Sequence, residues 1–155
     1  MSVIDAIKSR RSIRKYKSDA IPREIIEQIV EAGEYAASGM NRQQTIVVAI
    51  TNKEIRDRLS KDNASVMGRD GDPFYGAPAV LVVLAAKDCP TGIYDGSLVM
   101  GNLMLAAHHY GIGSCWIQVR LRGSDDVTAE EFVKKEAGLD PSWNVLSIVA
   151  FGRRP

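Results

Sequence analysis

The sequence predicts a three-layer α/β/α sandwich of the α+β class, in which helices cover both faces of a mixed β-sheet. Three observations lead to this prediction. Segments with the spacing of amphipathic helices alternate with short β-branched segments along the chain. Residues 79–84 are almost wholly apolar, so both faces of the strand they form must be covered. Residues 97–110 form a helix that is apolar nearly all round, which places it centrally or at a subunit interface.

The composition is that of one globular domain covering residues 1–155. A chain of 155 residues is long enough for an ordinary hydrophobic core. The net charge of +1 gives no general attraction to nucleic acid or to an acidic membrane, so neither is expected as a partner. The longest apolar run, 77–86, is much shorter than the roughly 20 residues that cross a bilayer. A charged N-terminus unlike a signal peptide, and two cysteines without a CxxC motif, predict a cytoplasmic location.

The first half of the chain is expected to hold three helices and one strand. Ser2 suits the N-cap of a short helix that ends at Lys8, and Pro22 begins a second helix that ends near Ala36. The β-branched segment 45–50 predicts a strand. Asn52 then caps a charged surface helix.

A long loop and five further elements are expected after that surface helix. Residues 63–76 predict the loop, and loops of this length in compact domains are often functional. Strands are expected over 79–84, 114–119 and 145–151, and helices over 97–110 and 128–137. The order in which the strands pair cannot be read from this pattern.

Residues 10–16 form the first candidate binding segment, with four cations and a hydroxyl group within a few positions. Guanidinium groups pair with phosphate or with adjacent carbonyl groups of a heterocycle, and Ser12 adds a neutral donor. Taken alone, such a run of charge more often faces solvent. A nucleic-acid surface is the weaker alternative, because aromatic side chains are not interleaved with the cations.

Two further segments carry groups suited to a ligand. Residues 38–44 place three side-chain amides and a hydroxyl group around a glycine, a set that matches a ring edge bearing N–H and C=O groups. Ordinary turn chemistry explains this segment equally well. Gly111 and Gly113 permit the backbone to approach a ligand closely, although Gly111 is also explained as the residue that ends a helix.

No metal site and no catalytic side chain are predicted. His108 and His109 are adjacent and have no carboxylate motif, so they suit the free carbonyl groups of a last helical turn better than a metal ion. Cys115 lies in an apolar strand and is expected to be an inert core thiol.

Together these segments resemble the nitroreductase superfamily of flavin-dependent oxidoreductases, in its short single-domain form. The resemblance spans nearly the whole chain and rests on the order of five motifs. These are RRSIRKY at 10–16, SGMNRQ at 38–43, NLMLAA at 102–107, GIGSCW at 111–116 and FGR at 151–153.

The resemblance implies a homodimer that binds two FMN molecules at the subunit interface. It assigns cofactor-binding residues in three groups: Arg10, Arg11, Ser12 and Arg14 from one subunit, Ser38, Gly39, Asn41 and Gln43 from the other, and the backbone at Trp116, Ile117 and Gln118 beside the isoalloxazine ring. Many relatives continue past the last strand into a basic tail that reaches the phosphate. In this chain Arg153 is expected to complete the phosphate site, with Arg154 exposed.

The activity that the resemblance implies is an FMN-dependent NAD(P)H oxidoreductase. Hydride passes from the nicotinamide to flavin N5 and then to a nitro, quinone or related acceptor, by a ping-pong mechanism. Arg14 is expected to stabilise negative charge at the pyrimidine edge of the flavin. Two alternatives stay open: another flavin reaction on the same fold, and a flavin-binding carrier or regulatory module without turnover.

Overall fold

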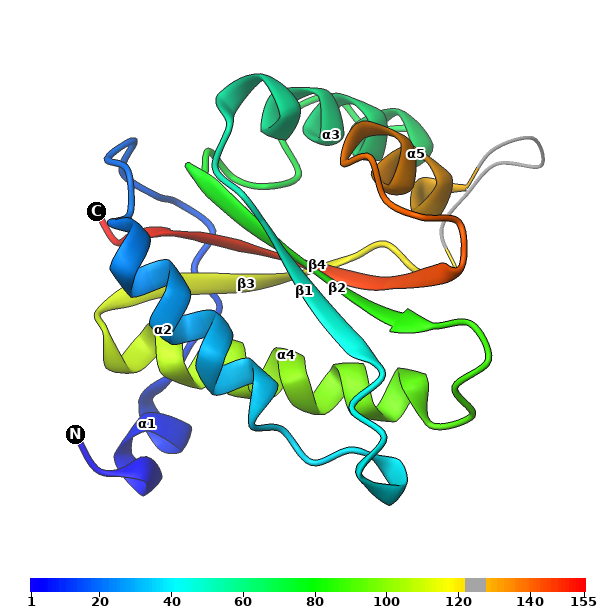
Figure 1. The fold of residues 1–155 in the computed structure, drawn as a ribbon. Coiled ribbons are helices and arrows are strands. Elements are labelled where there is room, and N and C mark those ends of the chain that lie inside the picture. Colours follow the sequence, from blue (N-terminus) through cyan, green and yellow to red (C-terminus); the bar gives the residue numbers. More distant parts are fainter. Residues whose placement is uncertain (122–127) are drawn as a thin grey trace.

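The computed structural model describes residues 1–121 and 128–155. The described elements follow the order α1 (Val3–Ser9), α2 (Arg23–Glu34), η1 (Gly39–Asn41), β1 (Thr45–Ile50), α3 (Lys53–Val66), β2 (Ala79–Ala86), α4 (Gly92–His109), β3 (Ile112–Gln118), α5 (Ala129–Glu136) and β4 (Trp143–Arg153). Every predicted helix and strand is present, and the three-layer α+β prediction is confirmed (Figure 1).

The sheet has four strands in the order β1-β2-β4-β3, and each neighbouring pair is antiparallel. The mixed sheet expected from the sequence is therefore antiparallel between its strands. Its parallel component, among the described residues, is one isolated bridge between Ser12 and Ser114. The reason lies in the connections. After α3, residues 67–78 return the chain to the end of the sheet where β1 finished, so Ile50 pairs with Val80 and β2 runs back along β1.

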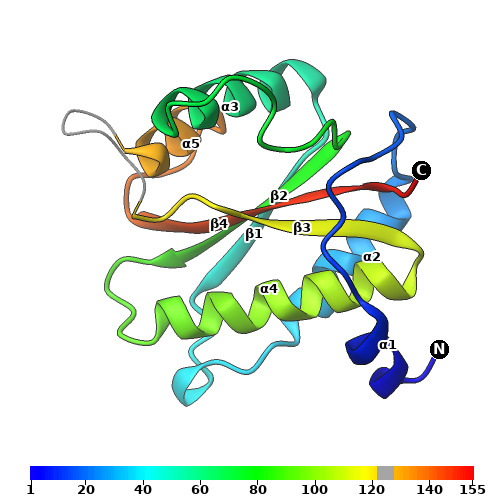
Figure 2. The same cartoon turned by 180° about the vertical axis from the view of Figure 1, so that it is seen from behind.

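Helices cover the sheet on both faces, as Figures 1 and 2 show. One apolar cluster packs α2 and α4 against the sheet, with Met100 and Leu103 of α4 fully buried. A second cluster packs α3 and α5 against the opposite face, around Leu59 and Phe74. The alternating side chains of β2 contribute to both clusters, which is why this strand is apolar throughout.

Two element boundaries differ from the prediction by four residues or more, for physical reasons. The central helix α4 begins at Gly92 rather than near residue 97, because Gly92 and Gly96 are packing positions and not helix breaks. A Cβ atom at Gly96 would lie 2.0 Å from Leu146 Cδ1, so glycine lets the Leu146 side chain of β4 pack directly against the helix there. Helix α3 continues to Val66, which shortens the loop expected over 63–76.

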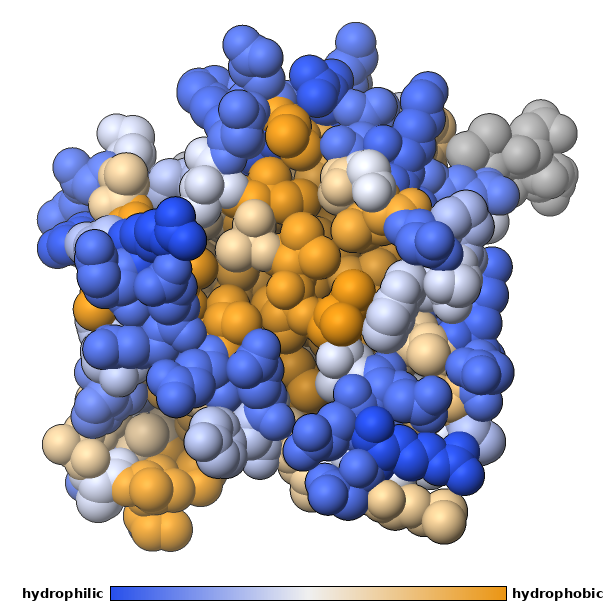
Figure 3. Space-filling model, viewed as in Figure 1, coloured by the Kyte–Doolittle hydropathy of each residue, from blue (hydrophilic) through white to orange (hydrophobic). Residues whose placement is uncertain are grey.

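Apolar side chains also gather on the surface. Figure 3 shows them at the centre of the face that carries the edge strand β1, and again over α1 at the lower left. Within β1, Val47 and Val48 are half-buried and Ala49 is exposed. No described helix is long and apolar enough to cross a membrane.

Candidate functional site

The N-terminal basic segment lies against the outer edge of the sheet. Residues 10–17 run in an extended conformation across β3 towards the C-terminal end of β4 (Figure 2). The Ile13 amide donates to the Ser114 carbonyl at 2.9 Å, and the Lys17 amide donates to the Arg153 carbonyl at 3.0 Å. These contacts fix the backbone that carries the predicted arginines.

Two glycines make room for this segment. A Cβ atom at Gly113 would lie 3.0 Å from Ile13 Cγ1, and one at Gly152 would lie 2.7 Å from Tyr16 Cδ1. The Tyr16 hydroxyl group donates to the Ile13 carbonyl at 2.5 Å and is within 3.3 Å of the Ala150 carbonyl. In the structure, Gly113 therefore admits another part of the chain, whereas the sequence suggested close approach to a ligand.

The arginines of the segment are not neutralised by carboxylates. The ion pairs among residues 1–121 and 128–155 include none of Arg10, Arg11 and Arg14. Arg11 Nη1 donates to the carbonyl groups of Lys8 and Arg10, both at 2.8 Å. Arg10 Nη1 is buried and has no hydrogen-bond partner. A buried guanidinium nitrogen without an acceptor is costly, so this position is suited to an anion.

His108, at the end of α4, adjoins the same cations. Arg154 Nη2 donates to His108 Nδ1 at 2.6 Å, and His108 Nε2 lies 2.8 Å from Ser9 Oγ. Ser9 Oγ donates in turn to the Asp5 carbonyl, so His108 Nε2 carries the proton and the ring is neutral. Burial lowers the pKa of His108, and the charges of Arg154, Arg10 and Arg11 lower it further.

These contacts refine two expectations from the sequence. His108 was expected to interact with the free carbonyl groups of its helix, but its ring nitrogens contact Arg154 and Ser9 instead. At the C-terminus, Arg153 and Arg154 are both exposed; the Arg154 side chain contacts His108, and no side-chain hydrogen bond is found for Arg153 within the described part of the chain. The role expected of Arg153 at a phosphate stays a prediction.

Ser12 and Arg14 lie on the side of the segment nearer Cys115. Burial raises the pKa of the Cys115 thiol, and the charge of Arg14 and a hydrogen bond with Ser12 oppose this rise. Burial also raises the pKa of the Tyr16 hydroxyl group, again opposed by Arg14. Cys115 is only 3% exposed, so the inert core thiol predicted from the sequence agrees with its surroundings.

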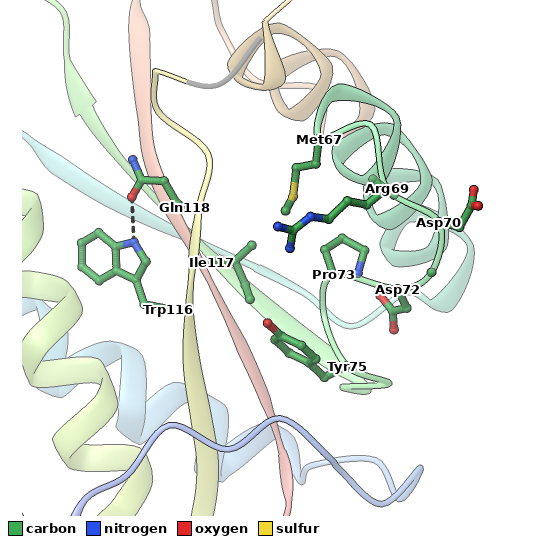
Figure 4. A pocket seen from close by; sticks show the side chains of 11 residues that line it. Met67, Arg69, Asp70, Asp72, Pro73, Tyr75, Trp116, Ile117 and Gln118 are labelled. Atoms are coloured by element: carbon green, nitrogen blue, oxygen red, sulfur yellow. Dashed lines mark hydrogen bonds between the residues drawn. The ribbon is translucent and has the colours of Figure 1, made fainter.

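A cavity of about 340 Å³ lies beside the end of β3. Trp116, Ile117 and Gln118 form one wall, and residues 67–75 form the other (Figure 4). Trp116 Nε1 donates to Gln118 Oε1 at 3.1 Å, and Gln118 Nε2 donates to the Arg120 carbonyl at 2.8 Å. The polar side-chain groups of Trp116 and Gln118 are thus paired with each other and with the Arg120 carbonyl. The approach of the β3 backbone to a ligand, expected from the sequence, stays a prediction.

The amide-rich loop 38–43 is held by a buried carboxylate that the sequence analysis missed. The Gly39 amide donates to Asp95 Oδ1 at 3.0 Å, and Thr91 Oγ1 donates to Asp95 Oδ2 at 2.8 Å. A Cβ atom at Gly39 would lie 2.5 Å from Thr91 Oγ1, so glycine is required there. The sequence did contain one signal for this contact, because Asp95 is an acidic residue in the first turn of a predominantly apolar helix. An acidic side chain at that position is ordinarily exposed, so the signal does not by itself indicate a buried carboxylate.

Hydrogen bonds within the loop fix the remaining predicted residues. The Gln43 amide donates to Ser38 Oγ at 3.0 Å, and Gln43 Nε2 donates to Asn41 Oδ1 at 3.3 Å. Asn41 and Gln43 have φ values of 53° and 50°, in the left-handed region, so the loop is tightly folded.

The predicted site residues form two groups at opposite ends of α4. The arginine segment reaches His108, whereas loop 38–43 is anchored on Asp95. These helix positions are separated by about 20 Å at 1.5 Å per residue. One protomer therefore brings together the predicted residues of the arginine segment and β3 on one edge of the sheet, and keeps loop 38–43 apart. Among the described residues, no group of three or more histidine, cysteine, aspartate or glutamate side chains is placed to hold a metal ion.

Known structures share the fold of this chain. An FMN-dependent nitroreductase of Clostridium difficile R20291 has a TM-score of 0.88 and 31% identity, covering 97% of this chain and 86% of that one. A nitroreductase of Bacteroides fragilis with bound FMN has a TM-score of 0.83 and 27% identity, covering 100% of this chain and 89% of that one.

A sequence relative from Methanothermobacter thermautotrophicus is provisionally named NADH dehydrogenase/NAD(P)H nitroreductase. It is 29% identical over 123 residues, which are 77% of this chain. The match spans only 62% of that relative's own length. The model of the nitroreductase family matches this chain over residues 7–72 and 68–153. The chain therefore belongs to the nitroreductase family.

Proposed function

We propose that this protein is an FMN-dependent oxidoreductase that transfers electrons from NAD(P)H to a small-molecule acceptor such as a nitro compound or a quinone. The observation that carries the proposal is the buried, unpartnered Arg10 Nη1 among cations that no described carboxylate neutralises. The family membership gives this anion site its context. Two structural relatives, one named FMN-dependent and one with bound FMN, support FMN as the ligand.

The described residues suit FMN in charge and in shape. A phosphate group carries nearly two negative charges and needs several donors when it is partly buried. Arg10, Arg11 and Ser12 supply such donors on one short segment, and Arg153 or Arg154 adds a further cation from the end of β4. The cavity beside Trp116 and Gln118 offers an open backbone edge for a planar polar ring.

Two-electron chemistry between NAD(P)H and the acceptor would be supplied by bound FMN, whose phosphate Arg10, Arg11 and Ser12 would hold. The chain contributes binding, orientation and charge. We propose that Arg14, whose charge already influences Tyr16 and Cys115, stabilises negative charge at the pyrimidine edge. No side chain of this chain is proposed as a nucleophile or as an obligatory acid.

We further propose a homodimer in the cytoplasm, with loop 38–43 of one subunit completing the site of the other. The separation of the two residue groups along α4 supports this arrangement, because one protomer does not join them. Exposed apolar side chains on α1, which lie at the lower left of Figure 3, and on α4 support a subunit contact over these helices. They are Val3, Ile4, Ile7, Ile93, Tyr94 and Leu98. Sedimentation of the purified protein measures the dimer directly.

The experiment that tests the function has two steps. Denaturing the purified protein should release FMN, and the intact protein should oxidise NADH or NADPH with a quinone or a nitroaromatic acceptor, giving parallel lines in double-reciprocal plots. Protein that neither contains nor takes up FMN would contradict the proposal. Bound FMN without turnover would instead favour a flavin-binding carrier.

A further inference from the structure

The edge strand β1 has backbone groups that no neighbouring strand uses. The Ala86 amide donates to the Gln44 carbonyl at 3.0 Å, so these two residues form a hydrogen-bonded pair where the β1–β2 ladder begins. Such pairs alternate along an antiparallel ladder, so the even-numbered residues of β1 face β2 with their N–H and C=O groups, and the odd-numbered residues direct theirs away from the sheet. The outward residues are Thr45, Val47 and Ala49. Among residues 1–121 and 128–155, no backbone hydrogen bond outside the sheet ladders involves them.

The edge also lacks the features that usually prevent a strand from pairing further. Protected edges carry charged side chains, proline or a bulge. Residues 43–52 contain no charged residue and no proline, and β1 pairs with β2 in an unbroken register. Figure 3 looks onto this edge and shows an apolar strip at the centre of the molecule, bordered by hydrophilic side chains. The β1 edge is therefore suited to receive another strand.

Charges at the two ends of β1 indicate which strand that is. Arg42 precedes β1 and Glu54 follows it; both are exposed, and no ion pair among the described residues includes either. The nearby Lys53 is already paired with Asp57. If two copies of β1 lie antiparallel about a two-fold axis, the start of each strand lies beside the end of the other, and the opposite charges meet at both ends. The edge is thus complementary to itself.

The same charges determine the register of the pair. Arg42 and Glu54 are equally far from Val48 along the chain, so a two-fold axis at Val48 brings each beside its opposite charge. In this register Val47 lies opposite Ala49 of the partner subunit. Both residues direct their backbone groups outward, so they form a hydrogen-bonded pair, as an antiparallel ladder requires. The side chains that meet are β-branched or small, and such pairs pack favourably across strands.

We propose that two copies of this chain associate through β1, edge to edge and antiparallel, so that their sheets join into one continuous sheet. This interface lies at the opposite edge of the sheet from β3 and the arginine segment, and it goes beyond the proposed function. It also differs from the proposed contact over α1 and α4. If both contacts form, the assembly is a tetramer, and if β1 alone associates, it is a dimer. An interface built on one strand is small, so the association depends on protein concentration.

Sedimentation over a range of concentrations tests the interface. Ala49 is exposed, so Ala49→Lys introduces a charge at the pairing edge without entering the core. The wild-type assembly should have twice the mass of the Ala49→Lys assembly. Leu121→Lys makes a similar change beyond β3, at a residue that is 84% exposed, and should sediment like the wild type.

The outcomes separate this inference from the proposed function. The mass should halve from tetramer to dimer or from dimer to monomer, so the result does not require the contact over α1 and α4. FMN content should be the same in the wild type and in Ala49→Lys. Equal masses of these two proteins would overturn the proposal. If the masses are equal but amide exchange shows the Thr45 and Val47 amides protected in the wild type, a strand of another protein occupies the edge, which also overturns it.

A disulfide tests the register. Residues opposite each other at a two-fold axis through Val48 form a non-hydrogen-bonded pair, with Cα atoms about 4.5 Å apart, a separation that a disulfide spans. Val48→Cys, in a Cys89→Ser background that removes the half-buried native thiol, should therefore form a disulfide between subunits under mild oxidation. Val47→Cys in the same background should not. A disulfide in Val47→Cys in place of Val48→Cys would overturn the register.

Exchange of the charges tests the pairing of the two ends. Arg42→Glu should weaken the association about fivefold or more, because the two-fold axis repeats each contact and turns attraction into repulsion. The double variant Arg42→Glu/Glu54→Arg should restore it. An unaltered association constant in Arg42→Glu, or a double variant that is no stronger than the single one, would contradict the antiparallel pair.

Discussion

At the scale of single residues, the cations gathered at the end of α4 have no described carboxylate among them. Arg154 contacts His108, and the charges of Arg10 and Arg11 act on the same imidazole ring. His108 accommodates them by remaining neutral, with Nδ1 accepting from Arg154 and Nε2 facing Ser9. In the unfolded chain these cations no longer surround His108, so its imidazole binds a proton more readily than in the folded protein. The free energy of unfolding therefore depends on pH through His108.

This dependence has a definite sign. The pKa of His108 is lowered from its ordinary 6.5, so just below that pH the unfolded chain binds a proton that the folded protein does not. The free energy of unfolding should therefore fall as the pH is lowered through 6.5 towards the folded pKa. Urea unfolding at about pH 7.5 and about pH 5.5 measures the fall. It should be smaller in His108→Gln, whose amide does not titrate, and an equal fall in both proteins would contradict the neutral imidazole.

A candidate residue could be predicted from the sequence when its signal lies in neighbouring positions, and not when its partner is distant along the chain. The run at 10–16 could be singled out because its charge is dense locally, and the glycines of 111–116 because of their spacing. The contact of Arg154 with His108 joins positions from two distant elements, so no local pattern signals it. Asp95 was missed for the same reason, because its partner Gly39 lies in another loop.

At the scale of elements, close packing of the segment 10–17 on the sheet is the feature that positions the arginines. Gly152 packs against Tyr16 and Pro78. A Cβ atom added at Gly152 would lie 2.8 Å from Tyr16 Cβ and 2.9 Å from Pro78 Cδ. Neither contact is with the end of a flexible side chain, so the segment itself must move if a methyl group is added.

Gly152→Ala should lower the free energy of unfolding by about 1–3 kcal/mol, the usual cost of overpacking, and should weaken FMN binding by shifting the arginine segment. Glu31→Ala is the control, because Glu31 is an exposed residue of α2 outside the ion pairs of the described residues. It should change the free energy of unfolding by no more than about 0.5 kcal/mol. Chemical unfolding of both variants measures the difference, and an unaltered Gly152→Ala protein would show that the segment is not packed as described.

The types of the elements were predictable because hydrophobic periodicity is a local property. The start of α4 and the end of α3 were not predictable in this way. Gly92 and Gly96 weaken a helix by intrinsic propensity, yet α4 includes both since β2 and β4 press against them. The start of α4 is thus set by tertiary packing, which a single sequence does not display.

At the scale of the whole molecule, the sheet order β1-β2-β4-β3 determines which surfaces remain for function. It leaves β3 at one edge, where the arginine segment and the cavity lie, and β1 at the other. Strand order depends on how loops return to the sheet, so the sequence predicted the layers but not this order. The all-round apolar character of α4 predicted a place in the core or at a subunit surface. One face of α4 packs in the core, and its exposed Tyr94 and Leu98 support the proposed subunit surface.

The central claim is that the cations around Arg10 hold the phosphate of FMN. The most direct measurement titrates FMN and riboflavin, which lacks the phosphate, into wild-type protein and into Arg10→Gln, with Lys17→Gln as an exposed control for charge. Removing a charge-assisted contact worth about 1.5–3 kcal/mol should weaken FMN about tenfold or more and leave riboflavin nearly unchanged. Equal losses for both ligands, or no loss for either, would contradict the phosphate site at Arg10.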